Sequence, residues 1–399
     1  MSFDLIVKGG TLPDGTVADI GINGDRIAAI EPSIDAEAGR VVDASGNLVS
    51  QPFVDPHFHM DATLSYGLPR IASGTLLEGI TLWGELKPVL THEAVKERAL
   101  AYCDWAVSMG LLAIRTHVDT GDDRLLAVEA LLEVKKQIAP YIDLQLVAFP
   151  QDGLYRSPNA RENIIRALDL GVDIVGGIPH FERTMSEGMR SVTELCEIAA
   201  KRGLMVDLHC DETDDPLSRH IEQLAYETKR LGLQGRVAGS HLTSMHSMDN
   251  YYVSKLLPLI AEAGVSAIPN PLINIMLQGR HDTYPKRRGM TRVPEMLKAG
   301  IRTGWGQDCV RSMVLPRHSR HARRRLHGIA RRPDVLARGH AHLLQHGHQG
   351  QRRDHGARSS RPGRWQIRKP GGARCGQSDR GGALARRAAL RRGEWEGRG

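Results

Sequence analysis

The sequence has few cysteines, and their spacing excludes the usual structural uses of this residue. Its 399 residues contain five cysteines, an odd number, at widely separated positions: Cys103, Cys196, Cys210, Cys309 and Cys375. No two of them have the C-x-x-C spacing, so the sequence indicates neither a disulfide framework nor a zinc site made of thiolates. We expect all five to be reduced thiols.

The chain also lacks a long hydrophobic run and a secretion signal. Hydrophobic residues make up 41% of the sequence, but no apolar run approaches the roughly 18 residues that a membrane-spanning helix needs. The opening residues MSFDLIVKGG have no basic region followed by an apolar stretch, which a signal peptide requires. We therefore expect a cytoplasmic protein with no membrane partner.

Acidic residues are scarce only near the C-terminus. Residues 311–399 contain 23 Lys and Arg against 5 Asp and Glu, a net charge of +18, whereas residues 1–310 contain 30 against 41, a net charge of −11. The overall charge of +7 is therefore not the property of a basic folded domain. We expect no nucleic-acid partner for residues 1–310, because nucleic-acid binding needs a positively charged surface.

What the sequence does contain is a regular alternation of helical and strand-like segments. Residues 1–50 read as short strands of a small β domain, and Asn23-Gly24 between two alternating runs predicts a hairpin. Residues 51–310 contain eight short apolar runs, which is the number that a (β/α)₈ TIM barrel requires, separated by segments with helical periodicity. The runs are FVDPHFH, LLAIRTHVD, IDLQLVAFP, DIVGGIPH, LMVDLHCDE, RVAGSHLT, VSAIPNPLIN and IRTGWGQDCV.

Polar residues follow these runs where such barrels carry their chemistry. His57 and His59 end the first run, and side chains two residues apart on a strand point the same way. An H-x-H pair alone is more often structural, but His209, His241 and Asp308 close the fifth, sixth and eighth runs. Because active sites of TIM barrels lie at the C-terminal ends of the strands, we expect these side chains to meet around one metal ion.

Residues 1 to about 310 resemble bacterial cytosine deaminases, a family within the amidohydrolase superfamily. The resemblance implies a single divalent metal, iron or zinc, held by His57, His59, His209 and Asp308. No lysine follows the fourth run to bridge a second metal. The family's motifs appear here in order as PHFHMDAT, SGTLLEGI, RTHVD, VAFPQDG, GGIPHFE, DLHCDE, GSHLTSMHS, PNPLINIMLQGRHDTYPKRRGMTRV and GQD. The family places the barrel at residues 51–310 and a small β-sandwich domain that includes residues 1–50. It also suggests that the protein forms a homo-oligomer.

The resemblance also implies roles for individual residues. Hydroxide activated by the metal attacks the ring carbon that bears the amine, which turns cytosine into uracil plus ammonia. His241 and Asp308 orient the water and accept its proton, and Glu212 delivers a proton to the adjacent ring nitrogen. Gln151 pairs with the carbonyl and N–H edge of the ring, with help from the Leu76 backbone.

Cys309 is a departure from the family pattern. Typical cytosine deaminases have a second aspartate directly after the metal-binding one, where this chain has a neutral, poorly accepting thiol in the substrate pocket. The exact substrate therefore stays open, and isocytosine, creatinine or an amino-triazine are alternatives to cytosine. All of them are amino-substituted rings that the same site could hydrolyse.

The second departure is the segment 311–399, which we interpret as an out-of-frame translation. It contains 22 arginines but one lysine, Lys369, and codons allowed for residues 311–333 can encode DPWYSLGTRDMLDVASMGLHAV one base later. That translation is similar to the segment that cytosine deaminases have at this point, including a tryptophan that closes the pocket. The last barrel helix and the C-terminal strands of the small domain would then be lost. Alternatives are a basic arm that binds nucleic acid and an inactive product.

Overall fold

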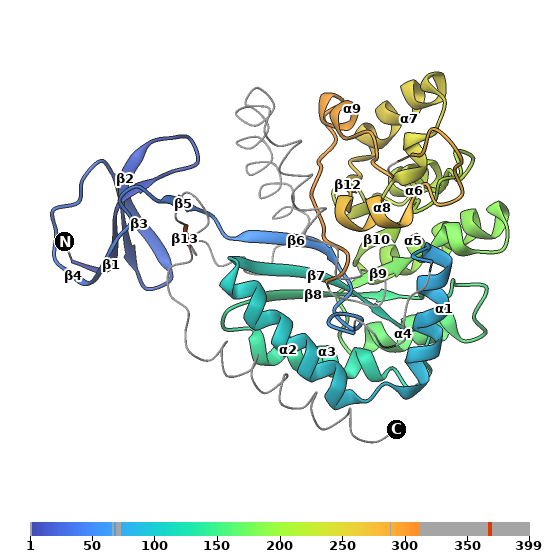
Figure 1. The fold of residues 1–399 in the computed structure, drawn as a ribbon, viewed down its shortest axis with the longest axis horizontal. Coiled ribbons are helices and arrows are strands. Elements are labelled where there is room, and N and C mark those ends of the chain that lie inside the picture. Colours follow the sequence, from blue (N-terminus) through green and yellow to red (C-terminus); the bar gives the residue numbers. More distant parts are fainter. Residues whose placement is uncertain (1, 66–67, 69–72, 288, 311–365, 369–399) are drawn as a thin grey trace. The chain divides into compact units, whose positions relative to one another are not determined.

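The computed structural model describes residues 2–65, 68, 73–287, 289–310 and 366–368 (Figure 1). The chain divides into two compact units, one of residues 1–52 with 359–399 and the other of residues 53–358. No helix within the described residues is long and apolar enough to cross a membrane.

The first unit contains a small β-sheet built mainly from the N-terminal strands. β1 pairs antiparallel with β2, which pairs antiparallel with β3, and the predicted hairpin is confirmed because Asn23 lies opposite Arg26. Ile6 and Val7 are both buried, and consecutive strand residues point to opposite faces, so apolar side chains cover both faces of β1. The strands are β1 (Phe3–Thr11), β2 (Val17–Asn23), β3 (Arg26–Glu31), β4 (Ala38–Asp43) and β5 (Leu48–Ser50).

The C-terminal segment of residues 311–399, here called the tail, contributes one short described strand to this sheet. β13 (Gln366–Arg368) pairs antiparallel with β5, with Ile367 opposite Val49. The rest of the predicted tail, residues 311–365 and 369–399, lies outside the described residues. The interpretation of this segment as out of frame therefore stays a prediction.

The second unit is the predicted barrel. Seven parallel strands follow one another around a sheet in sequence order, which is the arrangement that repeated β-α units produce. Their ends carry most of the residues singled out in the sequence. The strands are β6 (Phe53–Phe58), β7 (Leu111–Asp119), β8 (Asp143–Phe149), β9 (Ile174–Gly177), β10 (Met205–His209), β11 (Val237–Ser240) and β12 (Ser266–Ile268).

The eighth predicted run closes the barrel without forming a regular strand. On one side, Ala267 N donates to Arg302 O at 2.8 Å, and Gly304 N donates to Ala267 O at 2.9 Å. On the other side, Asp308 N donates to His57 O at 2.9 Å. Asp308 has a positive φ of 66°, which strand geometry does not allow, so the ladder is reduced to isolated bridges at each edge.

Helices cover the outside of the parallel strands (Figure 1). α3 shows the reason, since Leu131, Val134 and Ile138 recur at helical spacing and are fully buried. Thr75, Thr91, Thr184 and Asp249 begin four helices by accepting backbone N–H bonds. The α-helices are α1 (Leu76–Leu86), α2 (His92–Ser108), α3 (Leu126–Ile138), α4 (Ala160–Asp169), α5 (Met185–Arg202), α6 (His220–Arg230), α7 (Asn250–Ala263), α8 (Pro271–Leu277) and α9 (Val293–Lys298), with 3₁₀ turns η1 (Lys87–Val89), η2 (Pro179–Phe181) and η3 (Thr243–His246).

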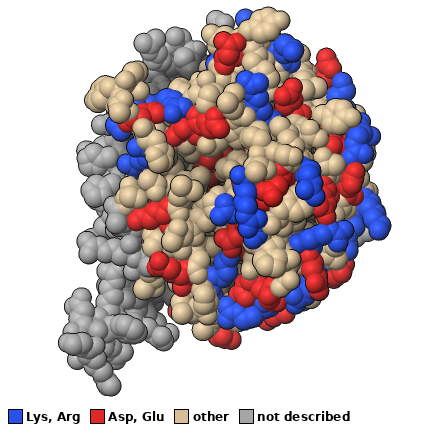
Figure 2. Space-filling model, turned by 90° about the vertical axis from the view of Figure 1, so that its right-hand side faces the viewer, with Lys and Arg blue, Asp and Glu red and all other residues tan. Residues whose placement is uncertain are grey.

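The surface seen in Figure 2 carries charges of both signs in close alternation. Lysine and arginine side chains stand beside aspartate and glutamate across this face, in keeping with ion pairs such as Lys96 with Glu133 and Arg230 with Glu197. Within the part of the chain that the structure describes, this face has no broad basic patch for a polyanion.

Candidate active site

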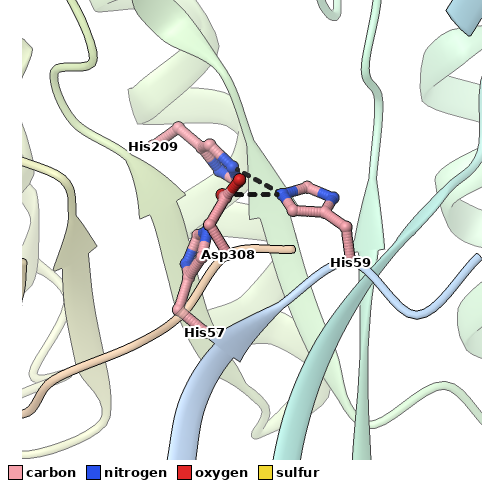
Figure 3. A group of neighbouring side chains, drawn as sticks. All are labelled: His57, His59, His209 and Asp308. Atoms are coloured by element: carbon pink, nitrogen blue, oxygen red, sulfur yellow. Dashed lines mark hydrogen bonds and ion pairs between the residues drawn. The ribbon is translucent and has the colours of Figure 1, made fainter. Parts of the chain in front are cut away.

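The four predicted ligands lie together at the C-terminal end of the barrel (Figure 3). His57 lies near the end of β6 and His59 just beyond it, His209 ends β10, and Asp308 belongs to the segment that closes the barrel. Their potential ligand atoms all lie within 4.8 Å of one another. His59 Nε2 is 3.2 Å from His209 Nε2 and 3.5 Å from Asp308 Oδ1. Three imidazoles and a carboxylate at this spacing suit a divalent ion such as zinc or iron.

The protons of His57 show why this group fits a cation. Burial, with the charges of His117 and His59, lowers the pKa of His57 well below its usual value, so the ring is neutral and has one proton. Its Nδ1 lies 2.9 Å from Ser240 Oγ, and Ser240 donates its only proton to Asp207 at 2.8 Å. The His57 proton must therefore be on Nδ1. The unprotonated Nε2 then faces Asp308 Oδ1 at 3.1 Å, and two acceptors at that distance repel each other unless a cation lies between them.

The other histidines of the group are also in the form that binds metals. Burial lowers the pKa of His59 to about 4, although the carboxylate of Asp308 raises it. Burial and the neighbouring His57 and His117 lower the pKa of His209 well below its usual value. Both rings are therefore neutral near pH 7, and a neutral imidazole is the ligand form.

Two of the predicted catalytic residues, His241 and Glu212, lie beside the ligand group, and the third, Asp308, belongs to it. His241 Nε2 is 3.6 Å from Asp308 Oδ1, and His241 Nδ1 is 3.3 Å from Glu212 Oε1. His241 and Asp308 both have positive φ, 69° and 66°, a backbone strain that is uncommon outside glycine and clusters at functional sites. Both of these uncommon backbone conformations therefore occur at predicted catalytic residues.

The surroundings of Glu212 favour the protonated form of its carboxyl group. Burial, together with the nearby charge of Asp308, raises the pKa of Glu212 well above its usual value. Asn274 Nδ2 donates to Glu212 Oε1 at 3.1 Å and lies 3.0 Å from His241 Nδ1. A carboxyl group that keeps its proton beside a metal group can donate it to a bound molecule.

A pocket opens over the ligand group and includes His59, His209 and Asp308 in its lining. It includes all three predicted substrate-binding residues, Gln151, Leu76 and Cys309. Cys309 is buried and packs in an apolar cluster with Ile273 and Leu277. The residues that line the pocket are His59, Asp61, Ala62, Leu76, Gly79, Ile80, Trp83, Gln151, Ile178, His209, Glu212, Leu277, Asp308 and Cys309. The site therefore combines one polar corner with an apolar wall, as pockets for small planar ligands do.

Trp83 is a pocket residue that the sequence reasoning missed. It lies two helical turns after Leu76 on α1, so the two side chains share a face, and helical periodicity could have found it. Its indole Nε1 donates to Asp119 Oδ2 at 2.6 Å, and Lys87 Nζ lies 2.8 Å from the same oxygen. Asp119 therefore fixes an aromatic wall of the pocket.

Comparisons with known proteins agree with this geometry. The model of the amidohydrolase family (Amidohydro_3) matches residues 40–323. An N-isopropylammelide isopropyl amidohydrolase of Pseudomonas sp. strain ADP is 32% identical over 79% of this chain and 76% of its own length. A pterin deaminase of Rhizobium rhizogenes is 27% identical over 74% of this chain and 68% of its own.

Solved structures give the same result. The crystal structure of a 5-methylcytosine deaminase from Klebsiella pneumoniae liganded with 5-fluorocytosine superposes with a TM-score of 0.75 at 42% identity, over 78% of this chain and 76% of that one. The same enzyme liganded with phosphonocytosine gives 0.75 at 43% identity. The TIM barrel, its small β domain and the resemblance to cytosine deaminases are thus confirmed. The chain belongs to the amidohydrolase family of metal-dependent C–N hydrolases.

Proposed function

We propose that this protein deaminates a cytosine ring to a uracil ring plus ammonia, and that it accepts cytosine with a small apolar group at C5. The observation that carries the proposal is the pocket itself, where the polar group of Gln151 and Glu212 shares a cavity with the apolar wall at Cys309. The similar Klebsiella pneumoniae structure, liganded with 5-fluorocytosine, supports a ring of this kind.

The residues divide the proton transfers of the reaction between them. A bound divalent ion, iron or zinc, supplies a nucleophile by lowering the pKa of water from about 15.7 toward 7. His241 and Asp308, 3.6 Å apart, orient that water and take its proton. Glu212 gives its proton to the ring nitrogen beside the attacked carbon. Asp308 then passes the proton taken from water to the exocyclic amine, which leaves as ammonia. The remaining hydroxyl proton returns to Glu212, and the ring keeps the oxygen of water as a carbonyl.

Gln151 and Leu76 hold the opposite edge of the ring. The side-chain amide of Gln151 offers both a donor and an acceptor, which matches the carbonyl and N–H of cytosine. Leu76 is the first residue of α1, where the backbone N–H has no partner within the helix, so its main chain can assist. These contacts select an amide-like edge and do not react.

Cys309 decides which substituent the ring can carry. A second carboxylate at this position would place a charge against C5 of the ring and would need its own hydrogen bonds. The thiol packs instead with Ile273 and Leu277, which leaves an apolar surface that a methyl group or a fluorine can contact. Cytosine itself fits the same space with less contact.

A substrate panel tests the proposal. We expect ammonia release from cytosine and 5-methylcytosine by the purified chain, loaded separately with iron and zinc, alongside a version with the reading frame restored after Val310. Isocytosine, creatinine and an amino-triazine represent the alternative rings. Faster release from one of these three, with silence on both cytosines, would overturn the cytosine proposal while leaving a C–N hydrolase.

We also propose that the enzyme works in the cytoplasm. Cys103, Cys196 and Cys210 are buried thiols, and no disulfide joins any of the described cysteines, as expected where the surroundings are reducing.

A further inference from the structure

A chain of buried polar side chains lies beneath the ligand group, on the inward faces of neighbouring strands. Asp207 precedes His209 by two residues on β10, so both side chains point into the barrel. Ser240 ends β11 and lies opposite His209 in the parallel register, and Arg115 reaches the same layer from β7. These residues and His57 form a chain that runs from the ligand group toward the floor of the barrel.

We propose that Asp207, held by Arg115, is a positioning residue that fixes through Ser240 which nitrogen of His57 is presented to the metal. The proposal rests on the metal centre of the proposed function and not on the identity of the substrate. It assigns a role to three side chains that the deamination chemistry leaves unused.

The argument begins with the single proton of the Ser240 hydroxyl. Asp207 Oδ1 accepts that proton at 2.8 Å, because an ionised carboxylate can only accept. Ser240 Oγ, 2.9 Å from His57 Nδ1, must then accept from the imidazole. His57 is thereby held as the Nδ1–H tautomer, with the lone pair of Nε2 directed at the ligand group.

Arg115 keeps Asp207 in its accepting form. Its Nη1 donates to Asp207 Oδ2 at 3.0 Å, and its Nε donates to Gln145 Oε1 at 3.1 Å. Asp207 is fully buried and the Arg115 side chain is 6% exposed, and a buried carboxylate is stable only with such a partner. With one oxygen bound to Arg115 and the other to Ser240, Asp207 has a fixed orientation.

The same network argues against a second metal ion at this level. His57, His117 and Asp207 are close enough to be ligands, but the Nδ1 of His57 is a donor to Ser240 and both oxygens of Asp207 already accept hydrogen bonds. The guanidinium of Arg115 supplies the positive charge that a cation would bring. His117 Nε2 lies 3.5 Å from Asp207 Oδ1, the oxygen that already accepts from Ser240.

Replacing Asp207 has a consequence that a purely structural role would not produce. In Asp207→Asn the amide oxygen stays with Arg115, so the amide nitrogen faces Ser240 and donates to its oxygen. The Ser240 hydroxyl then turns to donate to His57 Nδ1, which moves the proton of the ring to Nε2 and blocks the ligand atom. Ser240→Ala removes the acceptor and leaves the tautomer unfixed, which is a milder change.

The test measures zinc affinity of the full chain by competition with a chelator. Changes to such supporting residues weaken metal binding by about 10- to 100-fold, so we expect a loss in this range for Asp207→Asn and a smaller one for Ser240→Ala. The absorption bands of the cobalt-substituted protein should change in both. Matched controls are Glu227→Gln, a buried carboxylate paired with Arg230 outside the barrel, and Ser191→Ala, a buried hydroxyl on α5.

The melting temperature of the metal-free proteins separates positioning from folding. Weaker zinc binding and altered cobalt spectra, with metal-free melting temperatures like those of the controls, would support the proposal. Unchanged zinc affinity and spectra in both variants would overturn it. If Asp207→Asn does not fold, Ser240→Ala decides alone, since it leaves the pair of Asp207 and Arg115 intact. The zinc affinity, the cobalt spectra and the melting temperatures do not depend on which ring the enzyme deaminates.

Discussion

Glu212 is the residue whose surroundings bear most directly on the chemistry. Its carboxyl group is buried beside Asp308 and accepts a hydrogen bond from Asn274, surroundings that raise its pKa, as the proposed role of general acid requires. We expect Glu212→Gln to lower kcat for ammonia release by about 10²- to 10⁴-fold, the usual contribution of a general acid, because the amide keeps the contact with Asn274 but cannot transfer a proton.

The zinc content of Glu212→Gln shows whether a lower kcat comes from the lost acid or from lost metal. Glu212 is not one of the four predicted ligands, so we expect the variant to bind as much zinc as the parent protein. The control Glu227→Gln should retain full turnover. If Glu212→Gln keeps more than a tenth of the parent kcat, Glu212 is not the general acid.

The proposed preference between substituted and unsubstituted rings is tested at Cys309. Cys309→Asp introduces a charge into the apolar cluster with Ile273 and Leu277, where a methyl group on the ring would otherwise lie. One methylene in such a pocket is worth roughly 10- to 200-fold in specificity. We expect the ratio of kcat/KM for 5-methylcytosine over cytosine to fall by about tenfold or more.

The matched control is Cys196→Ala, which alters a buried thiol on α5 away from the pocket and should leave the ratio unchanged. An equal ratio in Cys309→Asp would show that the wall of the pocket at C5 is made by other residues.

The grouping of the four predicted ligands could be foreseen at this scale, while the residues that contact them could not. His57, His59, His209 and Asp308 stand at or near the ends of recognisable apolar runs, so the barrel pattern alone brings them together. The contact between Ser240 and Asp207 spans 33 positions and that between Arg115 and Asp207 spans 92. These contacts inside the barrel depend on the register between strands. The sequence pattern does not specify that register.

At the scale of elements, the segment that closes the barrel differs most from its prediction. IRTGWGQDCV was expected as an eighth strand, but its ladder is limited to bridges at Ala267 with Thr303 and Phe58 with Asp308. An apolar run predicts an extended segment, whereas Asp308, one of the predicted ligands, has a positive φ of 66°. This conformation interrupts the regular pairing at the end of the segment.

Gly306 in this segment provides a test of how tightly it is packed. A Cβ at this position would lie 2.7 Å from His57 Cβ and also meet the side chain of Asn270, so Gly306→Ala must displace the strand end that carries a ligand. We expect a loss of about 1–3 kcal/mol in unfolding free energy together with weaker zinc binding, measured by denaturant titration and chelator competition.

The control is a glycine with open space around it. At Gly84 on α1 a Cβ would meet nothing within 4 Å, so Gly84→Ala should stabilise the helix by about 0.5–1 kcal/mol. Should Gly306→Ala be as stable as the parent protein, the closing segment would have room to move and the bridges to β6 would not fix Asp308.

For the whole molecule, the order of the chain separates the chemistry from the tail. All four ligands and every residue assigned a catalytic role precede Arg311, and the described barrel is complete enough to assemble them. The charge of residues 311–399, on the other hand, has no counterpart in residues 1–310. The sequence predicts a boundary at Val310 in two ways. The net charge changes sign there, and the periodicity that indicates strands and helices ends there.

Restoring the reading frame after Val310 tests the prediction that residues 311–399 are out of frame. By resemblance to cytosine deaminases, we expect the restored segment to contain the tryptophan that closes the pocket and to supply a last helix that covers the barrel. We expect both proteins to bind zinc equally, because the ligands are shared, but the restored version to be more soluble, to melt at a higher temperature and to turn over faster. Comparable turnover and melting in the two versions would contradict this, and would mean that residues 1–310 carry the whole activity without the segment that the family places after them.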